Sequence, residues 1–278
     1  MELPAGFISL WSTINQLISI NNPIFVILLK KQIHIQKKRD MKIALIGYGK
    51  MGKEIEQIAL SRGHSVVLKI DVNNPEELTA ENLSKADVAI EFTSPATAVN
   101  NYFHCFEAGI PVVSGTTGWL DRKAEVDKKC TETNGCFFYA SNFSLGVNIF
   151  FEMNKYLARV MKDFPQYDIS MVEVHHTQKL DAPSGTAITL ANDIISINET
   201  KTNWTIDNPK SDSELYINPI REGVVPGIHT IKYDSDVDFI EITHSAYSRK
   251  GFAFGAVLAA EFCQSRKGIL SMTDLLKF

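Results

Sequence analysis

The chain has 278 residues, a formal net charge of −4 at pH 7, and 45% hydrophobic against 22% charged residues. This balance is typical of a globular protein with one large or two modest domains, and the lack of a positive net charge argues against nucleic acid as the main partner. The four cysteines, Cys105, Cys130, Cys136 and Cys263, show no Cys-x-x-Cys spacing, so we expect reduced thiols in a cytoplasmic protein.

Residues 1–40 are apolar but are interrupted by polar side chains and divided by Pro23. The longest uninterrupted apolar run, 24–29, is too short to span a bilayer, and the lysines follow the apolar stretch instead of preceding it as in a secretory signal. Met41 opens "MKIALIGYGKMG", which is typical of the start of a domain. We therefore expect residues 1–40 to be a dispensable extension and expect no membrane association.

Short apolar strands alternate with helical stretches from Met41 to about residue 145. The predicted strands are 42–47, 65–71, 86–94 and 111–118, and the predicted helices are 50–63 and 97–109. This alternation favours an α/β fold with a parallel, doubly wound sheet.

The pattern changes after about residue 145. Helix, strand, helix, a pair of strands and a final helix are predicted at 146–164, 168–176, 186–197, 228–246 and 251–266. The polar tract 198–214 is interpreted as a surface loop. We expect a first domain at 41–143, with 247–278 packing back on it, and a second, mixed α+β domain at 144–246.

A glycine-rich turn follows the first predicted strand. Gly47, Gly49 and Gly52 form G-x-G-x-x-G, which permits a tight turn, close approach of a pyrophosphate, and close packing of helix on strand. Asp71 ends the next strand, about 20 residues further on, where an acidic residue binds the ribose hydroxyls of a dinucleotide. A carboxylate there favours NADH over NADPH. The motif predicts a dinucleotide site that accepts NADH; a glycine turn without a ligand is the alternative.

The segment "HHTQKLDAPSGTA", residues 175–187, has several interpretations. A zinc site is disfavoured, and we expect no metal, because adjacent histidines are not the i, i+4 helical pair. A nucleophile elbow is disfavoured because Ser184 does not lie in G-x-S-x-G. One remaining alternative is an edge strand with a solvated Lys179. The other is an acid-base site for an anionic substrate.

The acid-base interpretation depends on the turn after the strand. Ser184 or Thr186 can cap a helix that begins near Ala187, and the unpaired amides there can bind a carboxylate. Histidine and lysine beside this turn can supply a proton and neutralise substrate charge. In an extended strand His175 and His176 point to opposite faces, so we expect different roles for them unless the backbone turns there.

The same segment resembles the signature of the 4-hydroxy-tetrahydrodipicolinate (dihydrodipicolinate) reductase family. Further blocks agree in order: "IGYGKMG" at 46–52, "EFTSP" at 91–95, "SGTTGW" at 114–119, "ASNFSLGVN" at 140–148 and "ITHSAYSRKGFAFGA" at 242–256. The resemblance implies a Rossmann-type dinucleotide-binding domain plus a mixed α+β substrate and oligomerisation domain. It also implies reduction of a cyclic dicarboxylate with NADH or NADPH, with loss of water, in lysine/diaminopimelate biosynthesis, by a homotetramer.

The resemblance further implies roles for individual residues. His175 would be the acid/base and Lys179 the proton donor. Substrate contacts would come from His176, Ser184, Gly185 and Thr186. The cofactor residues would be Gly47, Tyr48, Gly49, Lys50, Met51, Gly52, Asp71, Gly115, Thr116, Thr117, Ala140, Ser141, Asn142 and Phe143. His244 and Arg249 also lie in family blocks, and their roles stay open between function and structure.

Two residues depart from the family pattern: Glu91 stands where Asp is more familiar, and Lys50 stands where Arg is frequent. Neither change undermines the assignment, because each keeps the charge. Two alternatives to an enzyme of this family are a sensor or scaffold and a semialdehyde-type dehydrogenase. A sensor or scaffold that binds the nicotinamide cofactor would not need the histidine-lysine set, and a semialdehyde-type dehydrogenase would need a catalytic cysteine in a recognisable setting.

Overall fold

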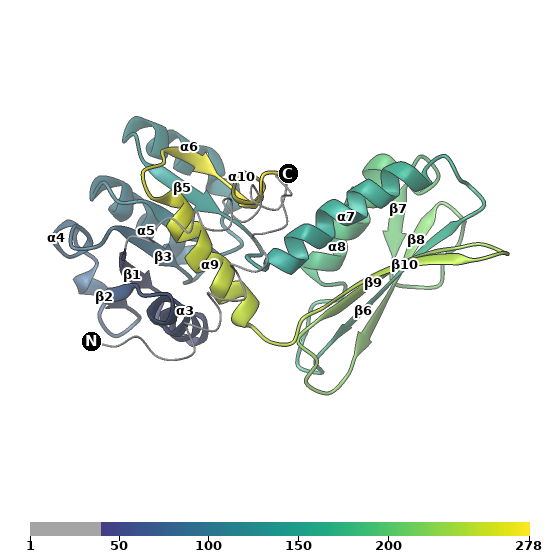
Figure 1. Cartoon of the computed structure of the whole chain (residues 1–278), viewed down its shortest axis with the longest axis horizontal. Helices are drawn as coiled ribbons and strands as arrows, with labels where there is room; N and C mark the ends of the chain where they lie inside the picture. The colour runs from purple at the N-terminus through teal and green to yellow at the C-terminus, as the bar shows by residue number, and fades with distance from the viewer. Residues whose placement is uncertain (1–39) are drawn as a thin grey trace, which may run out of the picture. The chain divides into compact units, whose positions relative to one another are not determined.

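The computed structural model describes residues 40–278, and within this range the chain forms two β-sheets with helices packed on them (Figure 1). The expectations for the N-terminal extension, 1–39, lie outside the described residues. Among residues 40–278, no helix is both long and apolar enough to cross a membrane.

The first sheet has six parallel strands in the order β11-β5-β4-β3-β1-β2. The strands are β1 (Lys42–Ile46), β2 (Ser65–Ile70), β3 (Val88–Glu91), β4 (Val112–Ser114), β5 (Cys136–Tyr139) and β11 (Gly268–Leu270). Four of them fall in the apolar runs that the sequence identified as strands, which confirms the parallel α/β class. β5 and β11 were not identified from the sequence.

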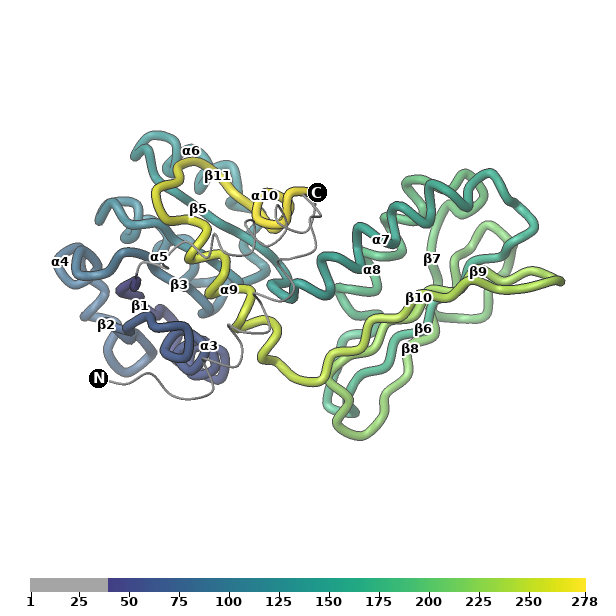
Figure 2. Tube along the Cα trace, viewed as in Figure 1, coloured from purple at the N-terminus to yellow at the C-terminus, as the bar shows by residue number. Residues whose placement is uncertain are grey.

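Helices cover both faces of this sheet (Figure 2). On one face α3 (Lys50–Ser61) packs against α9 (Lys250–Cys263), with the short helix α10 (Met272–Leu276) beside them. The other face carries α4 (Ala80–Leu83), α5 (Pro95–Glu107) and α6 (Lys123–Glu132). Two single 3₁₀ turns lie at Pro75–Glu77 and Leu120–Arg122. The strands are nearly continuous apolar runs because both faces are buried.

The second sheet is mixed and has the order β10-β9-β6-β8-β7. Its strands are β6 (Asp168–His175), β7 (Asn203–Thr205), β8 (Glu214–Arg221), β9 (Ile228–Asp234) and β10 (Phe239–Ser245). β6 pairs in parallel with β8 and antiparallel with β9. Two helices, α7 (Leu145–Met161) and α8 (Gly185–Ile197), bury their apolar sides against one face of this sheet.

The expectation of a loop over the whole polar tract 198–214 is wrong. β7 forms inside the tract and pairs in parallel with β8, while Trp204 is partly buried against the core. Lys201 is also buried: its Nζ lies 2.7 Å from Asp168 Oδ1 and donates to the carbonyl oxygen of Asp212 at 2.8 Å. The polar composition hid this strand because the neighbouring strand, not local propensity, stabilises it.

The chain passes from the first sheet to the second between β5 and α7, and it returns between β10 and α9. The returning helix comes very close to the outgoing segment, because Gly255 in α9 has its Cα against the backbone of Phe143. A Cβ added at Gly255 would lie 1.8 Å from the carbonyl oxygen of Phe143. Glycine at this position therefore sets the distance between α9 and the segment that leads into α7.

We predict that Gly255→Ala lowers the free energy of unfolding by about 1–3 kcal/mol or more, because α9 must shift to make room for the methyl group. Gly251→Ala in the same helix is the matched control, since its nearest new neighbour is Ser144 Oγ at 3.7 Å. The control should be as stable as the parent or more stable, because alanine favours helix. Urea denaturation of both variants is the measurement, and equal stabilities would contradict the prediction.

Candidate active site

The glycine turn between β1 and α3 has the geometry of a dinucleotide loop. Gly47 has φ +97°, and a Cβ there would lie 1.9 Å from the carbonyl oxygen of Phe92. At Gly52 a Cβ would lie 2.5 Å from the carbonyl oxygen of Gly47, so this residue lets the helix approach the turn. No atom lies within 4 Å of a Cβ built on Gly49. Steric need therefore explains the first and third glycines, whereas the second opens onto a cavity.

Two cavities border this turn. The Asp71 cavity, of about 620 Å³, is lined by Ile46, Gly47, Tyr48, Gly49, Ile70, Asp71, Val72, Pro75, Leu78, Phe92, Thr93, Ser94, Thr97 and Asn101. The Thr116 cavity, of about 450 Å³, is lined by Gly47, Gly49, Lys50, Met51, Phe92, Thr93, Pro95, Gly115, Thr116 and Thr117. Both adjoin the N-terminus of α3, where no side chain caps the helix. An open glycine, an uncapped helix start and an acidic residue at the end of β2 fit a dinucleotide.

Three of the predicted cofactor residues line neither these two cavities nor the third cavity described below. Gly52 is buried under the turn, and Ala140 and Phe143 are buried in the core, where the Phe143 ring packs on Phe92 and Phe138. The structure therefore places these three behind the cavities and not at their surface. The other predicted cofactor residues line a cavity.

Glu91, one of the two residues that depart from the family pattern, is fully buried at the end of β3. Its carboxylate accepts hydrogen bonds from Ser114 Oγ at 2.8 Å and Thr116 Oγ1 at 3.0 Å, and also from the hydroxyl and amide of Thr93. Burial raises the pKa of Glu91, while these hydrogen bonds act in the opposite direction. Thr93 and Thr116 line the Thr116 cavity, so Glu91 holds part of its wall from behind.

The third cavity, which we name the His175 cavity, has a volume of about 670 Å³. Its lining is Thr117, Ser141, Asn142, Phe151, His175, His176, Lys179, Ser184, Gly185, Thr186, Thr189, Pro226, Arg249 and Phe252. All six residues predicted for catalysis and substrate binding are in this set. Ser141 and Asn142, which were predicted on the cofactor side, line it as well. Thr117 borders both this cavity and the Thr116 cavity.

Both histidines border the same cavity because β6 ends at His175 and the chain turns after it. His175 is buried at 7% exposure, whereas His176 is half-buried. Lys179 follows in the turn, and its Nζ contacts the carboxylate oxygens of Asp181 at 2.8 and 2.9 Å. This contact holds the pKa of the Asp181 carboxyl below its usual value. The alternative of an edge strand is wrong, because β6 lies between β9 and β8 in the sheet, and Lys179 is partly exposed but paired with Asp181.

Of the two residues expected to cap α8, Ser184 and Thr186, Ser184 is the cap. Its Oγ accepts a hydrogen bond from the amide of Ala187 at 3.2 Å, and the helix begins at Gly185, two residues earlier than predicted. The start of α8, residues 184–186, therefore lines the same cavity that His176 and Lys179 border. Cationic and amide-rich contacts at one cavity are suited to a carboxylate ligand.

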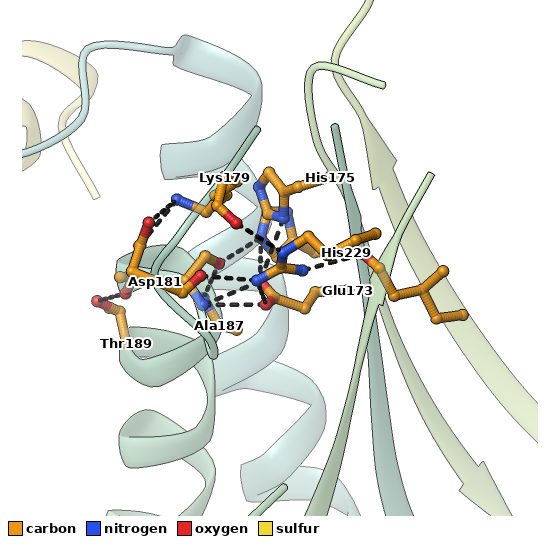
Figure 3. A network of polar contacts seen from close by, with 11 residues as sticks. Glu173, His175, Lys179, Asp181, Ala187, Thr189 and His229 are labelled. Atoms are coloured by element: carbon orange, nitrogen blue, oxygen red, sulfur yellow. Dashed lines mark hydrogen bonds and ion pairs between the residues drawn. The ribbon is translucent and has the colours of Figure 1, made fainter. Parts of the chain in front are cut away.

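Two buried polar residues behind this cavity, Glu173 and His229, and the partly buried Arg221 were not predicted. Glu173 is fully buried, its Oε2 lies 3.3 Å from His175 Nδ1, and the His229 ring packs edge-on against His175 (Figure 3). The ring is not aligned for a hydrogen bond, so the His175–Glu173 contact is mainly electrostatic. A signal existed in the sequence, because Glu173 lies two residues before His175 in a strand and so shares its buried face.

Burial alone would raise the pKa of Glu173, but contacts with His175, Ser184 and Arg221 outweigh it and lower the pKa to about 2. Burial, with a smaller contribution from His175, lowers the pKa of His229 to about 4. At neutral pH the structure therefore holds a carboxylate and a neutral imidazole beside the proposed acid.

Glu173, His175 and His229 also bring possible metal-ligand atoms within 4.8 Å of one another. Both oxygens of Glu173 already accept from the Ser184 amide at 3.1 Å, and Arg221 Nη2 donates to Oε1 at 3.1 Å. A guanidinium bonded to the same carboxylate repels a second cation. We therefore interpret this cluster as a hydrogen-bonded network.

Two family models match the chain. The dihydrodipicolinate reductase N-terminus matches residues 41–143, and the dihydrodipicolinate reductase C-terminus matches residues 146–276. The chain belongs to the dihydrodipicolinate reductase family. The glycine-turn cavities lie in the part matched by the N-terminal model, and the His175 cavity takes most of its lining from the part matched by the C-terminal model.

Two curated members of the dihydrodipicolinate reductase family illustrate the similarity. The 4-hydroxy-tetrahydrodipicolinate reductase of Christiangramia forsetii is 49% identical over 238 residues, which is 85% of this chain and 98% of that protein. That of Methanosarcina barkeri is 39% identical over 74% of this chain and 78% of its own length. A dipicolinate-bound dihydrodipicolinate reductase from Paenisporosarcina sp. TG-14 has the same fold, with TM-score 0.69, 22% identity, and coverage of 85% of this chain and 99% of that one.

We predict that His229 lowers the free energy of unfolding as the pH drops from about 6.5 to about 4. The unfolded chain takes up a proton at His229 in this window, while the folded protein, with a pKa of about 4 there, does not. The loss amounts to about 3 kcal/mol over the window. Glu173, with a folded pKa of about 2, adds a further loss only as the pH falls from 4.5 toward 2.

Urea denaturation between pH 4 and 7 measures this slope. His229→Asn should flatten it, whereas His104→Asn, on the exposed side of α5, is the matched control and should keep it. An unchanged slope in His229→Asn would show that another group carries the acid sensitivity.

Proposed function

We propose that the chain reduces 4-hydroxy-tetrahydrodipicolinate to tetrahydrodipicolinate, with loss of water and with NADH or NADPH as hydride donor, in lysine/diaminopimelate biosynthesis. The observation that carries this proposal is the His175 cavity, where a buried histidine, a lysine and the start of α8 meet at one cavity. The identity to reductases of this name supports it over most of the chain.

The proposed division of labour follows the two sheets. Residues 41–143, with 247–278 packed on the same sheet, would hold the dinucleotide through the glycine turn and Asp71. Residues 144–246 would bind the substrate. The bound nicotinamide supplies the hydride. Thr117, which borders both the Thr116 and the His175 cavities, marks where cofactor and substrate would meet.

Binding of the dicarboxylate would depend on Lys179, His176 and the turn at 184–186. Lys179 is paired with Asp181, a largely exposed side chain, so substrate binding would require an exchange of one carboxylate for another. The amides at the start of α8 would take part of the negative charge. The solved relative bound to dipicolinate, a planar dicarboxylate, supports a ligand of this class.

His175 would act as the acid/base. Hydride addition to a conjugated imine leaves electron density that a proton must neutralise, and a positioned imidazole is suited to this transfer. The burial of His175 excludes water from one side of the ring, and Glu173 on the Nδ1 side leaves Nε2 as the nitrogen available to the substrate. Loss of the hydroxyl as water takes up one proton at the oxygen and releases one from the neighbouring ring carbon, so this step consumes no net proton, and Lys179 would relay the proton.

Two alternatives, a semialdehyde-type dehydrogenase and a sensor or scaffold, have less support. All four cysteines are buried and free, and burial raises the pKa of Cys105, which opposes nucleophilic chemistry. The reported relatives carry the reductase name, so nothing in them supports a sensor or scaffold without catalysis.

We also propose a cytoplasmic homotetramer. Buried free thiols suit a reducing compartment. The second sheet is covered by α7 and α8 on one face, and Ile220, Phe239 and Ile240 are exposed on its strands. Apolar side chains left exposed on a sheet are typical of subunit contacts.

A coupled assay tests the activity, with the substrate made in situ from pyruvate and aspartate semialdehyde and with NADH loss followed by absorbance. We predict turnover by the parent, and kcat lower by roughly 10²–10⁴ in His175→Gln and in Lys179→Ala, the usual scale for lost acid-base help. Absence of turnover in a folded protein that binds NADH would refute the proposed activity. A near-normal kcat in both variants would show that other residues carry out the proton transfer.

Cofactor choice gives a separate prediction. The Asp71 carboxylate should repel the 2′-phosphate of NADPH, so the parent kcat/KM with NADH should not fall far below that with NADPH. Asp71→Ser should raise the NADPH/NADH ratio of kcat/KM by about tenfold. Asp236→Ser, an exposed acid in the β9–β10 turn, is the matched control and should leave the ratio unchanged. A strong NADPH preference in the parent would contradict the prediction.

A further inference from the structure

Glu173 and Arg221 form a partly buried ion pair directly behind the His175 cavity. They lie on neighbouring strands, β6 and β8, and Arg221 is the register partner of His175. Arg221 Nη2 is 3.1 Å from Glu173 Oε1, with the carboxylate fully buried and the guanidinium about one-fifth exposed. Neither residue lines the cavity, so neither is placed to touch a substrate.

The guanidinium of Arg221 also fastens the turn that carries Lys179. Its Nη2 donates to the carbonyl oxygen of Asp181 at 2.7 Å, and its Nε lies 3.3 Å from the carbonyl oxygen of Lys179. A planar guanidinium offers donors in a rigid fork, so these contacts define the path of the backbone between residues 179 and 181.

The carboxylate of Glu173 holds the opposite side of the site. Its Oε2 lies 3.3 Å from His175 Nδ1, and both oxygens accept from the amide of Ser184 at 3.1 Å. Ser184 is independently held by its cap to Ala187 and by a 3.1 Å contact between its Oγ and His229 Nε2. Loss of Glu173 would therefore release His175 more than it would release the start of α8.

We propose that Glu173 and Arg221 act together as positioning residues, holding the proposed acid His175 and the backbone of Lys179 in one fixed geometry. The inference rests on the proposed reductase function and adds two residues to it. Misplacement of a proton donor by about 1 Å lowers a rate on the order of a hundredfold. Neither Glu173 nor Arg221 lines the cavity, and Ser184 keeps its contacts with Ala187 and His229, so the effect should fall on kcat more than on KM.

The test is a double-mutant cycle with Glu173→Gln, Arg221→Gln and the double variant, assayed with NADH and the substrate formed in situ. Each single variant should lower kcat about 10- to 100-fold, with both KM values within about threefold of the parent. The kcat of the double variant should be about equal to that of the slower single variant, because both substitutions disrupt the same ion pair.

Lys201→Gln is the matched control. It breaks the Lys201–Asp168 pair, in which the lysine is buried, at the opposite end of β6, so it should lower the melting temperature while kcat stays at the parent value. If the Gln variants fail to fold, Arg221→Lys keeps the charge next to Glu173 but cannot supply the fork. Its kcat should still be at least about tenfold low, and a near-parent kcat would refute the positioning role.

The outcomes separate the two proposals. No turnover by the folded parent enzyme would refute the reductase function itself. If the parent turns over substrate, three results would refute the positioning pair while the reductase function stands. They are single variants within about threefold of the parent kcat, additive losses in the double variant, and losses in KM alone.

Discussion

The buried carboxylate of Glu173 is the constraint on which the arrangement of the candidate active site depends. A fully buried charge near the end of β6 is costly unless it is paired. Here the amide of Ser184 and the guanidinium of Arg221 donate to it, and the imidazole of His175 lies 3.3 Å away. Each donor belongs to a different part of the second sheet and its connections. Satisfying one carboxylate therefore orders the acid, the lysine turn and the start of α8 at the same time.

The first sheet uses a comparable device with a different balance. Glu91 ends β3 as Glu173 nearly ends β6, but its donors are neutral hydroxyls, an amide and a side-chain amide. The effect of burial is therefore the larger one at Glu91 and raises its pKa. At Glu173 the contacts with His175, Ser184 and Arg221 outweigh burial and lower its pKa. Each carboxylate supports a cavity wall from behind, one on the cofactor side and one on the substrate side.

The three cavities connect the two halves of the proposed reaction. The glycine turn, opened by Gly49 and shaped by Gly47, lies beside two of them, and Thr117 is shared between the second and the third. Gly47 directly follows β1 and Gly49 directly precedes α3, so these two elements hold the turn, whereas Thr117 lies in the loop after β4. The chain crosses between the sheets twice, and the close contact of Gly255 with Phe143 at one crossing ties these segments together.

The sequence by itself determined the fold class, the glycine turn, the family and the six residues from 175 to 186 that line part of the His175 cavity, because these are encoded locally, in alternation, spacing and a contiguous signature. It could not show that Ala140 and Phe143 lie in the core, that 203–205 is a strand, or that Arg221 lies behind His175. Those facts depend on which strands become neighbours: β8 is remote from β6 in the chain yet adjacent in the sheet. Glu173 was readable only in part, since alternation places it on the face of His175, while the donors that make its burial tolerable come together only in the folded sheet.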